Sequence, residues 1–252
     1  MSNPSDQTNT LTGKAYDDVI HPSAKTTGEI LNFIPRSIKV LLQGWEKWII
    51  NGEESIRLTS EAIKQKIEAI PEDRLTEPEA YIVVPAIQQL GYSYSSEELR
   101  ELYANLIVSS MDTEKKEQVH PAFVDILKKL TPDEAKIIQY LKGIDSIEYV
   151  DIILKDNQFG GYTTIHDHKT RLCDFVCLSE PLNELMYLEN LISLGILKDA
   201  AGIYKIMDDN YKLIEKRLGL DQLRAKSHSF ESKRSLYEVT AFGKSFIGTV
   251  VV

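Results

Sequence analysis

The chain is poor in cysteine, with only Cys173 and Cys177 among its 252 residues. Two cysteines four residues apart do not match the disulfide framework of small secreted domains, so we expect both thiols to be reduced. The first residues also lack a positively charged stretch followed by an apolar segment, which means that an export signal is not indicated. The sequence therefore predicts a cytoplasmic protein.

The motifs that mark common enzyme classes are missing as well. The sequence has no G-x-x-x-x-G-K-[ST] phosphate loop, no H-E-x-x-H helix and no G-x-S-x-G turn. NTP hydrolysis, zincin proteolysis and the commonest serine hydrolase pattern thus lack support. Acidic pairs such as Glu97 and Glu98 are explained by helix starts, where carboxylates favour the positive end of the helix dipole. We predict a protein that is not an enzyme, with no catalytic residues and no cofactor.

Positive charge is scarce over most of the chain but concentrated in one segment. The formal net charge of −9 opposes non-specific attraction to nucleic acid or to anionic lipid. Between residues 212 and 234, however, basic residues outnumber acidic ones. Five of these side chains are our candidates for contact with an acidic partner, or with nucleic acid: Arg217, Arg224, Lys226, Lys233 and Arg234. We expect the acidic partner to be a protein, because the overall charge disfavours nucleic acid.

Apolar residues at helical spacing dominate the first half of the chain. A capping box of Ser95 with Glu98 marks a helix start there, and a second box, Thr131 with Glu134, opens the following domain with Pro132 at the first helical position. Before these helices, residues 1–13 are polar and are expected to form a disordered tail. Residues 14–130 are therefore predicted to form a helical domain.

Both tryptophans lie on one amphipathic segment of this half. Its apolar stripe includes Ile38, Leu41, Trp45 and Trp48, with basic residues interspersed. A core helix explains this pattern, but tryptophan beside basic residues is also typical of helices that lie on a membrane surface. The apolar run is too short to span a bilayer. We take the four residues as candidates for contact with a partner or with a membrane surface.

The second half is less regular. An apolar helix over residues 181–194 ends at Gly195, and the sequences GILKD and SLYEVTAFGKSF follow with strand-like alternation. This order resembles a winged helix whose wing is stretched by an insert from about residue 208 to 234, holding one more helix. The predicted fold class is mainly α, with a helical N-terminal domain followed by a winged-helix-like α+β domain over residues 131–252.

A winged helix suggests a DNA-binding regulator as an alternative function. The helix that would enter the major groove has no Lys or Arg and carries Glu184 and Glu189, which argues against base readout. A second alternative is a zinc protein that uses His166 and His168 from one face of a strand together with Cys173 and Cys177 from one face of a helix. The three-residue gap between the cysteines departs from the usual zinc knuckle, so we predict no metal.

A family resemblance adds to these patterns. The segments KAYDDVIHPSAKTTGEIL, IPEDRLTEPEAYIVVPAIQQL, SSEELRELYANLIVSSMD and VHPAFVDILKKLTPDEAKIIQYL follow one another between Lys14 and Leu141. In this order they resemble the abortive infection alpha (Abi-alpha) family of bacteria and prophages. The resemblance implies a role in phage defence or prophage biology, and it brings no catalytic residues. We therefore expect a non-enzymatic protein that acts through protein or membrane-surface contacts, with homo-oligomerisation left open.

Overall fold

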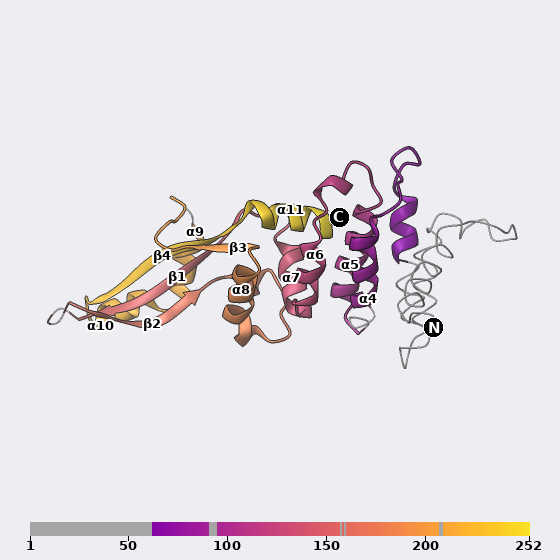
Figure 1. Cartoon of the computed structure of the whole chain (residues 1–252). Coiled ribbons are helices and arrows are strands. Elements are labelled where there is room, and N and C mark those ends of the chain that lie inside the picture. The colour runs from indigo at the N-terminus through magenta and orange to yellow at the C-terminus, as the bar shows by residue number, and fades with distance from the viewer. Residues whose placement is uncertain (1–61, 91–94, 157, 159, 207–208) are drawn as a thin grey trace, which may run out of the picture. The chain divides into compact units, whose positions relative to one another are not determined.

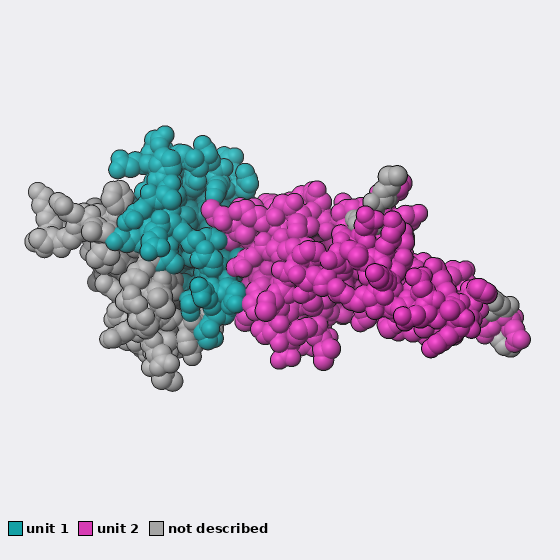
Figure 2. Space-filling model, turned by 180° about the vertical axis from the view of Figure 1, so that it is seen from behind, with its two compact units in different colours: residues 1–128 teal, residues 129–252 magenta. Residues whose placement is uncertain are grey.

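The computed structural model describes residues 62–90, 95–156, 158, 160–206 and 209–252 (Figure 1). The chain divides into two compact units, Met1–Lys128 and Lys129–Val252, shown in teal and magenta in Figure 2. The predicted tail and the tryptophan-bearing helix lie outside the described residues. The candidates Ile38, Leu41, Trp45 and Trp48 therefore remain predictions.

The first unit is helical in its described part. Residues 62–68 are helical, and α4 (Ala80–Leu90), α5 (Glu97–Ser109), the short η2 (Lys116–Gln118) and α6 (Ala122–Lys128) follow. Its core contains Ile87, Leu102 and Phe123, which are almost fully buried. Helix α5 begins one residue later than predicted, because Ser96 and not Ser95 accepts the Leu99 N–H at 3.2 Å.

The second unit opens with α7 (Pro132–Tyr140). The predicted capping box is confirmed, since the Glu134 N–H donates to Thr131 Oγ1 at 3.3 Å and the Thr131 N–H to Glu134 Oε2 at 2.6 Å. The remaining elements are β1 (Ser146–Lys155), β2 (Tyr162–Lys169), η3 (Leu172–Asp174), η4 (Pro181–Asn183), α8 (Glu184–Ser193), β3 (Leu197–Ala200), α9 (Asp209–Arg217), α10 (Leu220–Lys226), β4 (Phe230–Val239) and α11 (Ala241–Val250). Gly195, with φ of 76°, ends α8 in the predicted way.

The four strands form an antiparallel sheet in the order β2-β1-β4-β3. The long strands β1 and β4 pair along nearly their whole length, from Ser146 with Glu238 to Leu154 with Phe230. Helices α9 and α10 pack against one face of the sheet (Figure 1). The cluster beneath them consists of Val150, Ile152, Tyr211, Ile214 and Leu220, all at most 2% exposed. The opposite face of the sheet is the one that carries the site described below.

The predicted fold class is wrong. The described chain is a mixture of helices and a four-stranded sheet, without a clear winged-helix arrangement. The end of the expected wing insert, residues 230–234, forms the first half of β4. This strand lies in the interior of the sheet and pairs there with β1. The insert also holds two helices, α9 and α10, where one was predicted. The error arose because the charged start of β4, FESKR, does not show the apolar alternation of a strand.

Candidate functional site

Strand β2 carries a bulge opposite Asp151. Val150 pairs with Lys169 and Ile152 with His166, so the two residues Asp167 and His168 of β2 stand opposite Asp151 alone. His168 adopts φ of 48°, the only positive φ among the non-glycine residues of the described ranges. One residue in this left-handed region allows a strand to carry an extra residue, and such bulges redirect side chains. Asp167 and His168 are thereby brought to Asp151.

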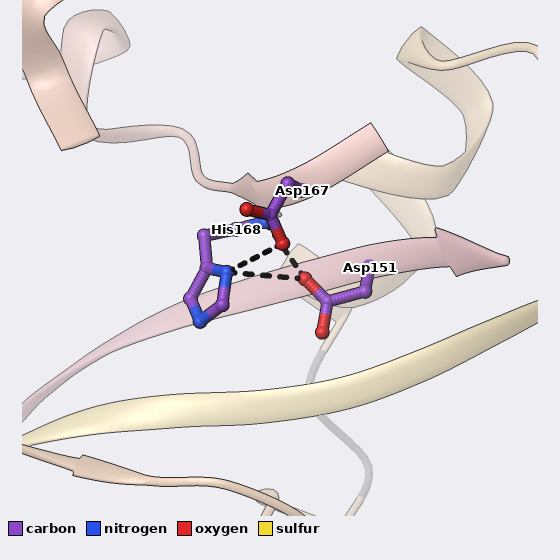
Figure 3. A group of neighbouring side chains, drawn as sticks. All are labelled: Asp151, Asp167 and His168. Carbon is purple, nitrogen blue, oxygen red and sulfur yellow. Dashed lines mark hydrogen bonds and ion pairs between the residues drawn. The ribbon is translucent and has the colours of Figure 1, made fainter. Parts of the chain in front are cut away.

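The bulge places one imidazole among three carboxylates. His168 Nδ1 lies 2.8 Å from Asp167 Oδ1 and 3.6 Å from Asp151 Oδ1. Figure 3 marks both contacts with dashed lines. On the other edge of the ring, Nε2 lies 3.8 Å from Asp199 Oδ2, which belongs to β3. The backbone N–H of His168 donates to Asp151 Oδ1 at 2.7 Å. We call the group of Asp151, Asp167, His168 and Asp199 the bulge cluster.

Two buried tyrosines form the floor of the bulge cluster. The His168 ring stacks on Tyr149 with 4.5 Å between centroids, and Tyr149 lies 4.7 Å from Tyr237. The Tyr149 hydroxyl donates to Asp199 Oδ1 at 2.7 Å. Burial, together with the hydrogen bond to Asp199, raises the pKa of Tyr149 well above its usual range. The hydroxyl therefore stays protonated and holds the Asp199 carboxylate in place.

The carboxylates around His168 favour the protonated form of its imidazole. Partial burial of the ring disfavours the imidazolium, but the hydrogen bond to Asp167 and the charges of Asp151 and Asp199 outweigh it. The pKa of His168 is therefore raised above its ordinary value. In its protonated form, the imidazole links β2 electrostatically to β1 and β3.

We expect a pH-dependent loss of stability that requires His168. A histidine whose pKa is higher in the folded state stabilises the fold fully below its unfolded pKa, and this stabilisation disappears as the pH rises through the folded value. Since a partly exposed ion pair contributes about 1 kcal/mol, the free energy of unfolding should fall by about this amount as the pH rises from about 6.5, the ordinary histidine pKa, through the raised folded value. Denaturant unfolding of the wild type and of His168→Gln at several pH values measures it. An equal pH dependence in both proteins would contradict the assignment.

Several of the predicted basic candidates form interactions within the chain. Arg234 donates to both oxygens of Glu215, at 2.7 and 2.8 Å, and Arg217 contacts both oxygens of Asp174 at 2.8 Å. Lys233 Nζ lies 3.8 Å from the centroid of the Tyr162 ring. The five candidates belong to α9, α10 and β4; they are Arg217, Arg224, Lys226, Lys233 and Arg234. Their role toward an acidic partner remains a prediction.

The predicted zinc ligands are not gathered into one site. His166 pairs with Ile152, whose side chain packs under α9 and α10, and so the bulge separates His166 from His168. Cys173 lies in the one-turn η3, not in a longer helix, and its Sγ donates to Glu184 Oε2 at 2.9 Å. Burial and the nearby Glu184 raise the pKa of Cys173 to about 12, so it is a neutral thiol at neutral pH. A neutral thiol is a poor zinc ligand.

Most of the bulge cluster was not predicted from the sequence. Of its members only His168 was a candidate, and it was grouped with cysteines that lie elsewhere. In a regular strand Asp167 and His168 would lie on opposite faces, and only the bulge, which the sequence IHDHK does not reveal, brings both to Asp151. Asp151 and Asp199 carried no local signal.

Comparison with known proteins supports the family suggested by the sequence. The model of the abortive infection alpha family matches residues 51–250, which include nearly all of the described chain. The match begins later than the predicted resemblance and extends through the second unit. No curated protein matches the chain.

A solved structure of an uncharacterized protein from the hydrocarbon-degrading marine bacterium Alcanivorax borkumensis SK2 is similar over 54% of this chain and 94% of its own. Its sequence identity is 13% and the TM-score is 0.33. In the part of the chain that the structure describes, no helix has the length and apolar character needed to cross a bilayer. From the match over residues 51–250, the chain belongs to the abortive infection alpha family.

Proposed function

We propose that this protein serves in phage defence as a non-enzymatic component of abortive infection, and that it acts in the cytoplasm by binding a protein partner through its second unit. Family membership supports the biological role. The observation that carries the mode of action is a short apolar segment after β3, which we call the 203–206 segment.

The 203–206 segment presents large apolar side chains to solvent. Ile203 is 62% exposed, Tyr204 53% and Ile206 85%. Large exposed apolar side chains that gather in one short segment are characteristic of surfaces that bind other macromolecules. Burial of an exposed isoleucine on binding contributes about 1.5–3 kcal/mol. The two isoleucines, together with Tyr204, could therefore form the centre of a protein interface.

The backbone of the segment is anchored. The N–H of Gly202 donates to Ser235 Oγ at 2.9 Å and that of Ile203 to the Ala200 carbonyl at 2.9 Å. The Lys205 ammonium pairs with Glu148 at the base of the segment. An anchored loop loses less conformational entropy on binding than a free one. The segment therefore suits recognition of a partner.

Charge favours a protein over an anionic membrane as the partner. The formal net charge of −9 repels a surface rich in anionic lipid at long range. Apolar contacts to a protein carry no such penalty. Membrane-surface contact through Trp45 and Trp48 is the competing mode, and the experiment below includes it.

Phage challenge of bacteria that express the protein tests the proposal. We expect the wild type to reduce plaque formation by at least one member of a phage panel and Ile203→Ser/Ile206→Ser to lose at least about tenfold of this protection. Removing two isoleucines from an interface costs more than about 1.4 kcal/mol, which is tenfold in affinity. Leu213→Ser, which alters an exposed leucine on α9, is the matched control and should protect normally.

Two results would count against the proposal. Undiminished protection by the double isoleucine variant would exclude the 203–206 segment, and no protection by the wild type against the panel would remove the support for a defence role. Sedimentation with anionic liposomes tests the competing mode, which is contact with a membrane surface. Wild-type protein that sediments with vesicles, but not after Trp45→Ala/Trp48→Ala, would assign the contact to a membrane surface.

A further inference from the structure

We propose that Asp151, Asp167 and His168 bind one divalent transition-metal ion, of the Mn²⁺ or Zn²⁺ type, on the face of the sheet opposite α9 and α10. One oxygen from each carboxylate and Nδ1 of the imidazole would be the ligands. This site is distinct from the predicted cysteine-containing set and does not depend on the proposed function.

The spacing of the three ligand atoms suits one ion. All of them lie within 4.8 Å of one another. His168 Nδ1 is 2.8 Å from Asp167 Oδ1 and 3.6 Å from Asp151 Oδ1. Ligands about 2.1 Å from a metal and about 90–110° apart are separated by about 3.0–3.4 Å. The two distances from Nδ1 are thus within a few tenths of an ångström of this spacing, and the two carboxylate oxygens, which lie within 4.8 Å of each other, would close on the ion by side-chain rotation.

The second edge of the imidazole faces a carboxylate, Asp199, at an ion-pair distance that a small movement would shorten to a hydrogen bond. When Nδ1 binds a metal, Nε2 keeps its hydrogen, and a carboxylate usually accepts it. Asp199 Oδ2 lies 3.8 Å from Nε2, and the Tyr149 hydroxyl holds the other oxygen of Asp199 at 2.7 Å. Tyr149 also fixes the plane of the ring by stacking. Asp199 is thus a positioning residue of the site.

The charge balance favours a dication. Within the described ranges, no Lys or Arg forms an ion pair with Asp151, Asp167 or Asp199, so a single imidazole faces three carboxylates. Lys233, which pairs with Asp151 in the sheet register, directs its Nζ to the Tyr162 ring instead. A metal ion would replace the proton on Nδ1 and neutralise more of the negative charge than that proton does.

The ligand types select the class of metal. Two carboxylates and one imidazole are a mixed oxygen and nitrogen set, which suits Mn²⁺, Fe²⁺ or Zn²⁺, whereas Mg²⁺ and Ca²⁺ prefer oxygen alone. Three protein ligands leave further positions to water. Asp167 is 61% exposed on its side chain and His168 27%, so an ion can reach the site from solvent. Bound metal would join the edge strand β2 to β1.

Calorimetric titration of the metal-stripped full chain with Mn²⁺ and with Zn²⁺ tests the proposal. We expect about one ion per chain and at least about tenfold weaker binding in His168→Ala and in Asp167→Asn. Asp199→Asn should weaken binding by about tenfold or more through the loss of positioning. The matched controls His166→Ala and Cys173→Ser, two and five residues from His168, should bind as the wild type does.

Each result decides the assignment. Failure of the wild type to bind either ion, or unchanged affinity in His168→Ala or Asp167→Asn, would overturn the proposal. Loss of binding in Cys173→Ser would show that the Cys173 thiol is a ligand, which would also contradict the proposed site. Because metal and proton compete for Nδ1, affinity should also decrease as the pH is lowered. Circular dichroism establishes folding of each variant, and the exposed position of Asp167 keeps the test informative if His168→Ala unfolds.

Discussion

The Gly243→Ala substitution should destabilise the second unit by about 2–4 kcal/mol, although it adds a single methyl group in a helix. Gly243 lies in the first turn of α11, where a Cβ atom would stand 2.2 Å from the carbonyl oxygen of Ile196 and 3.0 Å from its carbon. The Ile196 carbonyl cannot withdraw freely, because it accepts the Thr240 N–H at 3.0 Å. Thermal unfolding should show a fall in Tm of about 10 °C.

Gly248 provides the control on the same helix. A Cβ atom at this position meets nothing within 4 Å, and alanine is favoured over glycine in a helix by up to about 1 kcal/mol. Gly248→Ala should therefore keep or raise the Tm. Equal Tm values for the two alanine variants would show that α11 does not approach Ile196 as closely as described.

Replacing Asp133 with alanine is the second change with a large expected effect. The carboxylate is nearly buried and accepts hydrogen bonds from the N–H groups of Ser179 and Glu180 at 2.9 and 3.0 Å, from the Tyr187 hydroxyl at 3.2 Å and from Lys136 at 3.0 Å. Its loss would remove the acceptor that the Ser179 and Glu180 N–H groups and the Tyr187 hydroxyl use, whereas Lys136 also donates to the Cys177 carbonyl and to Ser179 Oγ. We expect a cost of about 3–5 kcal/mol in the free energy of unfolding, measured with denaturant.

The same carboxylate should contribute to acid sensitivity. Burial disfavours the charged form, but the hydrogen bonds from Ser179, Glu180 and Lys136 outweigh it and lower the pKa of Asp133 far below its usual range. A carboxyl with a lowered folded pKa stabilises the fold above its unfolded pKa, and this stabilisation is lost as the pH falls toward the folded value. The wild type should therefore lose more stability below about pH 4 than Asp133→Ala does. Asp221→Ala, at an exposed first-turn position of α10, is the control and should change little.

Local signals predicted helix ends well, because the responsible residues are neighbours in sequence. Thr131 and Glu134 form their capping box, and Gly195 ends α8, as predicted. Strand β1 gave no comparable signal. It is buried on both faces, so its residues do not alternate between apolar and polar, and such runs cannot be distinguished from buried helix by periodicity.

The bulge cluster could not be predicted for a related reason. The period of a strand places residues two apart on one face, which grouped His166 with His168. Two register shifts between β1 and β2 disrupt that period. Asp199 joins the cluster through β3, 31 residues beyond His168 in the chain, and no local pattern encodes this proximity. Sheet pairing assembles the cluster, and the pairing was the part of the fold that sequence analysis did not find.

The interior position of β4 has a consequence for synthesis of the protein on the ribosome. Strands β1 and β3 are both made before residues 230–239, yet each must pair with that strand. Translation proceeds at about 5–20 residues per second. The edge of β1 that pairs with β4 therefore stays unpaired for several seconds after β1 and β2 have been made. During translation, therefore, the nascent second unit cannot close its sheet until residues 230–239 have been made.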